Sequence, residues 1–262
     1  MVEPSGIPAP VAAATVLLLR DEPQGGFSVF MVQRSMKSSF MPGAYVFPGG
    51  KVDPQDYGQP VDLEDDAVLS RFDSELSLED ARAHLVAAVR EVAEEVFVSL
   101  ESVAGMQVFS RWVTPAIESR RFDTWFLIAK MPAGARPIHD DHEVVASRWV
   151  EPRTAVERYG DGLILLAPPT FYTLADLARW GSATAAIDAA ARRKVTAVQP
   201  RFAEVAGRMT ILLPGDPLYP SECPVDGPTR IVMGEAGRWW VVDPARSASW
   251  PGSGSAPDSP GP

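Results

Sequence analysis

The chain has 262 residues, of which 46% are hydrophobic, and a net charge of −10 at pH 7. This apolar content suffices for a core, whereas the acidic balance argues against binding to nucleic acid. The single cysteine, Cys223, excludes an internal disulfide, and one cysteine with three scattered histidines builds no zinc site. The longest mostly apolar run, Val11 to Leu19, is too short to cross a bilayer, and no basic segment indicates a signal peptide. We expect a cytoplasmic protein without a membrane partner.

The N-terminal part predicts a β-hairpin, formed by residues 15–19 and 27–33 around the turn-forming DEPQGG. A short strand at 44–47 follows and leads into Pro48-Gly49-Gly50. Residues 51–80 are rich in acids and show little periodicity, which predicts an inserted surface loop with a short helix near 65–72. We interpret this acidity as solvation rather than as a lid.

The rest of the chain alternates between helices and strands. The pattern S-x-x-[DE] at 77–80 predicts the start of a helix over 78–99. Further strands are expected at 106–112, 122–130, 147–150, 211–213, 229–233 and 238–242, with a turn at 234–237. Further helices are expected from Pro152, with Thr154 as cap, at 170–180, and at 184–195, closing with Arg192, Arg193 and Lys194. Residues 1–243 form one predicted domain, and 244–262 a disordered tail.

The helix predicted over 78–99 carries an unusual group of charges. Glu91, Glu94 and Glu95 fall on one of its sides, while Leu85 and three valines fall roughly opposite. Like charges at this spacing repel one another, so a bound cation is the natural compensation. A solvated acidic face is the alternative.

Two motifs resemble the signature of the Nudix family. Arg90-Glu91-Val92-Ala93-Glu94-Glu95 matches the REUxEE core of the pattern Gx5Ex7REUxEExGU, and Val98 falls on its last aliphatic position. Phe47-Pro48-Gly49-Gly50 matches the FPGG that enters this box. The resemblance implies an α/β fold, a Nudix-type α/β/α sandwich with a mixed central sheet, and hydrolysis supported by Mg²⁺ or Mn²⁺.

The chain departs from the family pattern at three points. The earlier box glutamate falls on Arg82, the box glycine falls on Phe97, and the acidic loop lengthens the box. The earlier glutamate usually pairs with the box arginine in the family. Arg90 therefore needs another partner, for which Glu79 and Asp80 are the candidates.

A second resemblance is to the coenzyme A diphosphatases of the Nudix family, whose pattern is LLTxR[SA]x3Rx3Gx3FPGG. Arg34-Ser35, Gly43 and FPGG fall in its register, whereas Ser39 replaces its second arginine. The run RSMKSSFMPGAYVFPGG, the long insertion, ESRRFDTWFLIA and LLAPPTFYTLADL are closest to the peroxisomal-type subgroup.

The Nudix resemblance implies a role for each box residue. Glu91, Glu94 and Glu95 are the expected metal ligands, together with a backbone carbonyl of Gly49 or Gly50. Carboxylate oxygens suit Mg²⁺, which is a hard cation. Among the same residues, Glu94 is the expected catalytic ligand, and Arg90 is expected to orient the helix through an ion pair.

The segment HDDHEVVASRW offers a further acid. Glu143 opens an E-x5-W pattern ending at Trp149 and is our choice for an additional ligand or general base. A loop acid that faces water is the alternative. A transition-metal site at His139 and His142 is a weaker alternative, because oxygen ligands already supply the chemistry.

Three arginines are candidates for contact with substrate phosphates. Arg34 lies at the predicted end of a strand, where a surface charge is the alternative. Arg121, with Arg120, precedes the strand at 122–130, where a structural ion pair is an equally open interpretation.

These observations predict an enzyme that hydrolyses the diphosphate bond of a nucleoside diphosphate linked to another moiety. Coenzyme A or acyl-CoA is the favoured small-molecule partner, and NADH, ADP-ribose and FAD are alternatives. A nucleotide-metabolite sensor that has lost catalysis is the alternative of another class. Many Nudix relatives form homodimers, and this chain leaves that question open.

Overall fold

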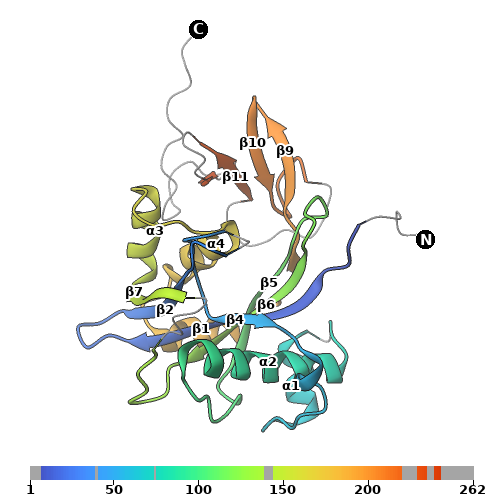
Figure 1. The fold of residues 1–262 in the computed structure, drawn as a ribbon, viewed down its shortest axis with the longest axis vertical. Helices are drawn as coiled ribbons and strands as arrows, with labels where there is room; N and C mark the ends of the chain where they lie inside the picture. The colour runs from blue at the N-terminus through green and yellow to red at the C-terminus, as the bar shows by residue number, and fades with distance from the viewer. Residues whose placement is uncertain are drawn as a thin grey trace.

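The computed structural model describes residues 7–38, 41–73, 75–138, 144–219, 229–234 and 239–242 (Figure 1). An eight-stranded mixed sheet has the order β3-β2-β1-β6-β5-β8, with β4 paired to β1 and β7 to β2. Its strands are β1 (Val11–Asp21), β2 (Phe27–Arg34), β3 (Tyr45–Val46), β4 (Gly49–Lys51), β5 (Gln107–Val113), β6 (Phe122–Lys130), β7 (Val144–Val150) and β8 (Ala197–Val198). The helices are η1 (Pro54–Asp56), α1 (Asp65–Arg71), α2 (Leu78–Val96), α3 (Pro152–Gly160), α4 (Pro168–Leu177) and α5 (Ala183–Ala190).

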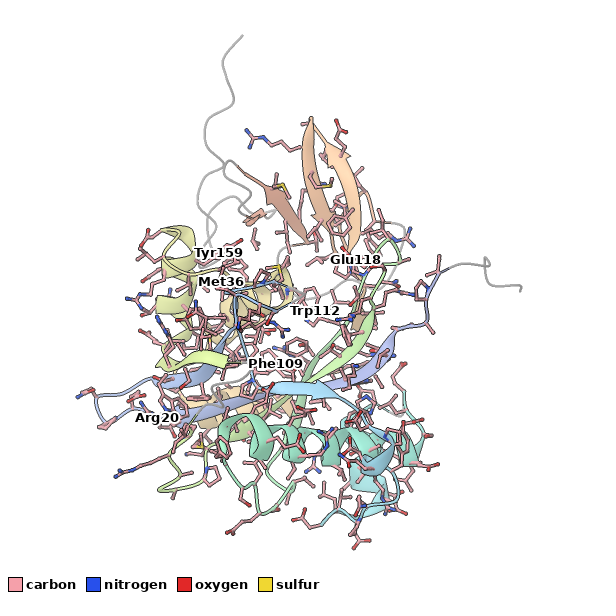
Figure 2. The ribbon with its side chains drawn as sticks, viewed as in Figure 1. Arg20, Met36, Phe109, Trp112, Glu118 and Tyr159 are labelled. Atoms are coloured by element: carbon pink, nitrogen blue, oxygen red, sulfur yellow. The ribbon has the colours of Figure 1, made fainter. Side chains whose placement is uncertain are left out.

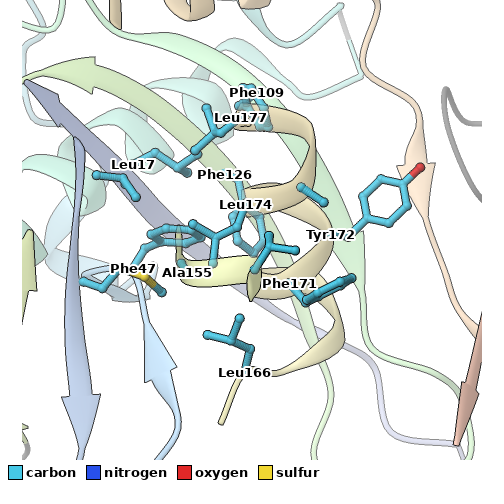
Figure 3. Close-up of a cluster of buried hydrophobic side chains, with 14 of the residues drawn as sticks. Leu17, Phe47, Phe109, Phe126, Ala155, Leu166, Phe171, Tyr172, Leu174 and Leu177 are labelled. Atoms are coloured by element: carbon cyan, nitrogen blue, oxygen red, sulfur yellow. The ribbon is translucent and has the colours of Figure 1, made fainter. Parts of the chain in front are cut away.

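Both faces of the central sheet are covered by helices. Successive residues of β1 point to opposite faces, so Val16 and Leu18 join a core that includes α1 and α2. Leu17 and Leu19 join a second core with α3, α4 and α5. Figure 3 shows this second core, in which the α4 side chains lie close to Phe126 of β6. The predicted α/β/α sandwich with a mixed sheet is confirmed.

The predicted order of elements is largely present. β1 and β2 form the expected antiparallel hairpin, with Leu19 opposite Val29. Thr154 is not a helix cap, because Glu151 occupies the N-cap of α3 and accepts a 3.0 Å hydrogen bond from the Thr154 hydroxyl. The helix expected over 184–195 ends at Ala190, before the three basic residues. Of the remaining expectations, the turn at 234–237 falls largely, and the tail from 244 wholly, outside the described residues.

The acidic insertion is attached to the fold by buried apolar side chains. It contains the expected short helix, α1, and its Val68 and Phe72 side chains are fully buried in the core beneath α2. An ion pair joins Asp65 of α1 to Arg82 of α2. Most acids of the segment are exposed, as the interpretation of this acidity as solvation expects, whereas Asp56, Val68 and Phe72 are buried.

A second, four-stranded antiparallel sheet follows α5 and has the order β12-β11-β10-β9. Its strands are β9 (Arg201–Val205), β10 (Arg208–Leu212), β11 (Arg230–Met233) and β12 (Trp239–Val242). We call it the C-terminal sheet, and sequence patterns did not predict β9. One register row crosses it, in which four apolar residues are directly paired: Phe202, Ile211, Ile231 and Val241. All four pack against the core that contains α4, so this row attaches the C-terminal sheet to the rest of the molecule.

Candidate active site

Helix α2 presents Glu91 and Glu95 to β4. The Ser77 hydroxyl accepts a 3.1 Å hydrogen bond from the Asp80 backbone N–H and so caps the helix as predicted. Leu85 and Val92 are fully buried on the sheet-facing side. Because α2 is held against the sheet in this way, residues near its C-terminal end lie beside the Gly49-Gly50 turn.

The glycine pair allows the carboxylates to lie against the backbone. Gly49 has φ +153°, and a Cβ there would lie 2.4 Å from the Ala14 carbonyl oxygen. The Gly49 N–H donates a 3.0 Å hydrogen bond to Glu95 Oε2. A Cβ on Gly50 would lie 2.3 Å from Glu91 Oε1. Only glycine leaves room for these contacts, so the FPGG motif and the glutamates form one structural unit.

Arg90 is held by the insertion. Its Nε and Nη2 donate to the two carboxylate oxygens of Asp56 at 2.8 and 2.9 Å, and the Asp56 side chain is 1% exposed. Arg90 Nη2 also donates to the Lys51 carbonyl at 3.0 Å. Neither Glu79 nor Asp80 is the partner, so that prediction was wrong. Asp80 instead accepts a hydrogen bond from the Tyr57 hydroxyl.

The electrostatics of this cluster favour a cation. Burial raises the pKa of Glu91, and the hydrogen bond from Arg90 only partly offsets this effect. Burial would also raise the pKa of Asp56, but hydrogen bonds from Arg90 and the Asp53 N–H outweigh it and lower the pKa. Asp56 is thus held as the charged partner of Arg90, whereas Glu91 lacks full compensation for its charge.

The three expected metal ligands are not gathered around one point. Glu91 and Glu95 line the same cavity, whereas Glu94 is 58% exposed and accepts a 3.0 Å hydrogen bond from Arg90 Nη1. Within the described part of the chain, no three His, Cys, Asp or Glu side chains are grouped as a metal site requires. Two carboxylates beside a glycine backbone still suit a hard divalent cation, and Glu94 shares the donor Arg90 Nη1 with Glu91.

A cavity of about 950 Å³ extends from the glycine pair across the central sheet. Basic side chains line it despite the acidic balance of the whole chain: Arg34, Lys37, Lys51 and Arg120. The loop after β2 is closed by hydrogen bonds from the Gly43 N–H to the Arg34 carbonyl, at 3.2 Å, and from the Arg34 N–H to the Ala44 carbonyl, at 3.0 Å. This closure fixes the backbone of Arg34 at the cavity wall, and cations in this position suit an anionic ligand.

The other predicted site residues have different positions. Arg34 Nε is buried and has no hydrogen-bond partner among the described residues. Arg121 is 9% exposed, and its guanidinium donates to the Thr114 and Pro8 carbonyls at 3.1 and 2.8 Å. These contacts favour a structural role for Arg121, through backbone carbonyls rather than through the ion pair considered above. Glu143 lies outside the described residues.

Comparisons with known proteins identify the family. A family model described as the NUDT19 Nudix domain matches residues 97–177. Acyl-coenzyme A diphosphatase NUDT19 of Xenopus laevis is 24% identical over 287 residues, covering 79% of this chain and 75% of the relative. The human protein of the same name is 27% identical over 278 residues, with 76% and 74% covered. The chain is a Nudix hydrolase. It lies close to the coenzyme A diphosphatase subgroup.

The fold of this Nudix hydrolase is also similar to a solved structure. The crystal structure of a NUDIX hydrolase from Alicyclobacillus acidocaldarius has a TM-score of 0.58 and 24% identity, covering 70% of this chain and 97% of that chain. Within the described residues, no helix combines the length and apolar character needed to cross a membrane.

Sequence reasoning on this Nudix hydrolase missed Asp56 and the part of the cavity wall that comes from the C-terminal sheet. A signal for Asp56 was present in Asp53-Pro54-Gln55-Asp56, where an acid, a proline and a second acid have capping-box spacing. The Asp53 N–H donates to Asp56 Oδ2 at 2.8 Å. This local turn presents Asp56 to Arg90.

Proposed function

We propose that this Nudix hydrolase cleaves the diphosphate bond of coenzyme A or acyl-CoA with the aid of Mg²⁺ or Mn²⁺. Water adds to one phosphorus, and the bond between that phosphorus and the bridging oxygen breaks. Coenzyme A then yields 3′,5′-ADP and 4′-phosphopantetheine. The observation that carries the proposal is the pair Glu91 and Glu95 against the glycine backbone, inside a cavity with basic walls.

In this proposal the box residues hold the cation and the basic residues hold the substrate. Glu91 and Glu95, with Glu94 and a carbonyl of Gly50, would bind the divalent ions. Such ions neutralise the diphosphate and lower the pKa of the attacking water. Arg34 contacts a phosphate at the cavity wall, and Glu143 remains our predicted general base.

The supporting experiment incubates the protein with coenzyme A and either Mg²⁺ or Mn²⁺ and follows both products by chromatography. We expect turnover that needs the metal and falls by about a thousandfold in Glu91→Gln, since a ligand charge is removed at nearly constant size. Glu79→Gln is the control, because Glu79 is exposed on the first turn of α2, away from the cavity. Electron paramagnetic resonance measures the binding of Mn²⁺. This binding should weaken in Glu91→Gln and stay unchanged in Glu79→Gln.

Other results would replace the proposal. Turnover of NADH, ADP-ribose or FAD without turnover of coenzyme A would identify a different diphosphate substrate. Nucleotide binding without cleavage of any of these compounds would identify a sensor.

A further inference from the structure

The floor of the cavity runs from the glycine pair to Trp112. Neighbouring strands place four cavity-lining residues in one register row: Lys51 of β4, Ala13 of β1, Thr124 of β6 and Trp112 of β5. Three strand spacings separate the two ends, which is roughly 14 Å. The row begins with a cation beside the carboxylate site and ends with a buried aromatic ring. The floor is therefore polar at one end and apolar at the other.

The walls around Trp112 are also apolar. Tyr172 of α4 packs edge-on against its ring, with a centroid distance of 5.5 Å. The cavity is also lined by Pro168 and Pro169, which open α4 without backbone N–H donors. A helix start that lacks two donors is a poor anion site. The aromatic ring and the helix start thus suit an uncharged group.

The C-terminal sheet covers the same cavity through one end of its apolar row. Phe202 of β9 and Ile211 of β10 are direct cross-strand partners, and both line the cavity. The next residue in the row, Ile231 of β11, is in the core and is not among the cavity-lining residues. In Figure 2, Trp112 lies below this sheet as drawn. Among the described residues of the C-terminal sheet, those that line the cavity belong to β9 and β10.

We propose that Phe202 and Ile211 form the wall of a subsite that receives the uncharged arm of the substrate, the part beyond the diphosphate on the side away from the nucleotide. The inference rests on the proposed function, in which this arm is pantetheine or acyl-pantetheine. A cavity of about 950 Å³ is at the upper end of the range for small-molecule sites, so it accommodates an arm as well as a diphosphate. The C-terminal sheet is then a determinant of specificity.

The chain supplies a matched pair of variants for the test. Ile211 and Ile231 are 3% and 1% exposed and directly opposite each other, but only Ile211 lines the cavity. The two reaction products serve as ligands, since 4′-phosphopantetheine carries the arm and 3′,5′-ADP lacks it. Their dissociation constants are measured by calorimetry, with Mg²⁺ present. This readout does not require catalysis.

We expect Ile211→Ala to weaken 4′-phosphopantetheine binding about tenfold, because a side chain that contacts the arm loses three carbons. Binding of 3′,5′-ADP should stay unchanged, and Ile231→Ala should leave both ligands unaffected. If the alanine variants fail to fold, Ile211→Val and Ile231→Val remove one carbon each and should show the same contrast at about threefold.

Three results would overturn the subsite. Equal effects of Ile211→Ala and Ile231→Ala on 4′-phosphopantetheine binding would show that the apolar row of the C-terminal sheet has only a structural role. Weaker binding of 3′,5′-ADP alone would place the nucleotide there. Unchanged affinity for both ligands in Ile211→Ala and Phe202→Ala would remove these residues from the site. Failure of the proposed function is a separate result, because it appears as no coenzyme A turnover by the unmodified protein.

Discussion

The acidic insertion and the C-terminal sheet are both attached to the central sheet, but they reach the site through different chemistry. The insertion supplies Asp56, whose carboxylate holds Arg90 on the helix that carries the glutamates. The C-terminal sheet supplies Phe202 and Ile211, which close the cavity with apolar surface. The insertion therefore controls where the carboxylates lie, and the sheet controls the shape of the space beside them. A charged hydrogen bond orients the side chain that it holds, whereas apolar walls select a ligand by its shape.

The largest effect expected from this comparison concerns the core of the insertion. Phe72 is fully buried and packs edge-on against Trp125, with a centroid distance of 4.9 Å. Phe72→Ala should lower the free energy of unfolding by about 3–5 kcal/mol, because it leaves a cavity under α2. Chemical denaturation measures this loss. Asp66→Ala, at an exposed position of α1, should change it by less than about 0.5 kcal/mol. Equal small losses in both variants would show that Phe72 does not attach the insertion to the core.

The next effect concerns the ion pair between the insertion and α2. Asp56→Asn keeps the size of the side chain and removes its charge, which leaves Arg90 without its buried partner. We expect a loss of about 2 kcal/mol in unfolding free energy and a 10- to 100-fold loss of activity, because the helix is less firmly oriented.

The control for this ion pair is the neighbouring aspartate. Asp53 is 48% exposed on its side chain and lies 3.8 Å from Arg90. Asp53→Asn should leave activity within about twofold, since exposed ion pairs contribute little. If Asp53→Asn matched Asp56→Asn in activity, the bidentate contact would not be what orients the helix.

Local patterns explain why much of the fold followed from the sequence. Helix α2 has a cap at Ser77 and a continuous buried face, and β6 has nine residues rich in branched and aromatic side chains, so both were predicted closely. Strands β4 and β8 have three and two residues, which are too few to show an alternating pattern. They exist because neighbouring strands pair with them, and such pairing is a tertiary effect.

The candidate site divides in the same way. Two short motifs, REVAEE and FPGG, contain Glu91, Glu95 and Gly50, so the sequence identified these residues as candidates. The structure brings them together. Asp56 lies 34 positions from Arg90, and its role depends on how the insertion folds back. Arg121 is the opposite case, since a basic residue before a strand gives no sign that backbone carbonyls will satisfy it.

The pH dependence of stability is a second test of the contact between the insertion and α2. His84 is 3% exposed and packs against Phe72, with ring centroids 6.1 Å apart, and its Nδ1 lies 2.7 Å from the Asp80 carbonyl oxygen. Burial lowers the pKa of His84, and the hydrogen bond to Asp80 only partly opposes this. The folded state therefore binds a proton less readily than the unfolded state.

The sign of the pH effect follows from that shift. The contribution of His84 to stability is complete above its ordinary pKa of about 6.5 and is lost as the pH falls below this value. Between pH 7.5 and 5.5 the unmodified protein should lose about 1 kcal/mol more unfolding free energy than His84→Gln. Parallel pH profiles for the two proteins would show that His84 remains accessible to protons beneath the insertion.

The smallest effect concerns the end of α2, where Phe97 occupies the position of the box glycine. Phe97 has φ +54° and ψ 34°, so it closes the helix in the left-handed conformation that glycine adopts without steric cost. Burial of its side chain contributes little to stability, because the residue is 62% exposed. Phe97→Gly should raise the unfolding free energy by about 0.5–1 kcal/mol. This value is the gain from steric relief minus the loss from the greater conformational freedom of the unfolded chain. Phe97→Ala keeps a Cβ and should show no such gain, so a gain in both variants would trace the effect to removal of the exposed ring rather than to the backbone.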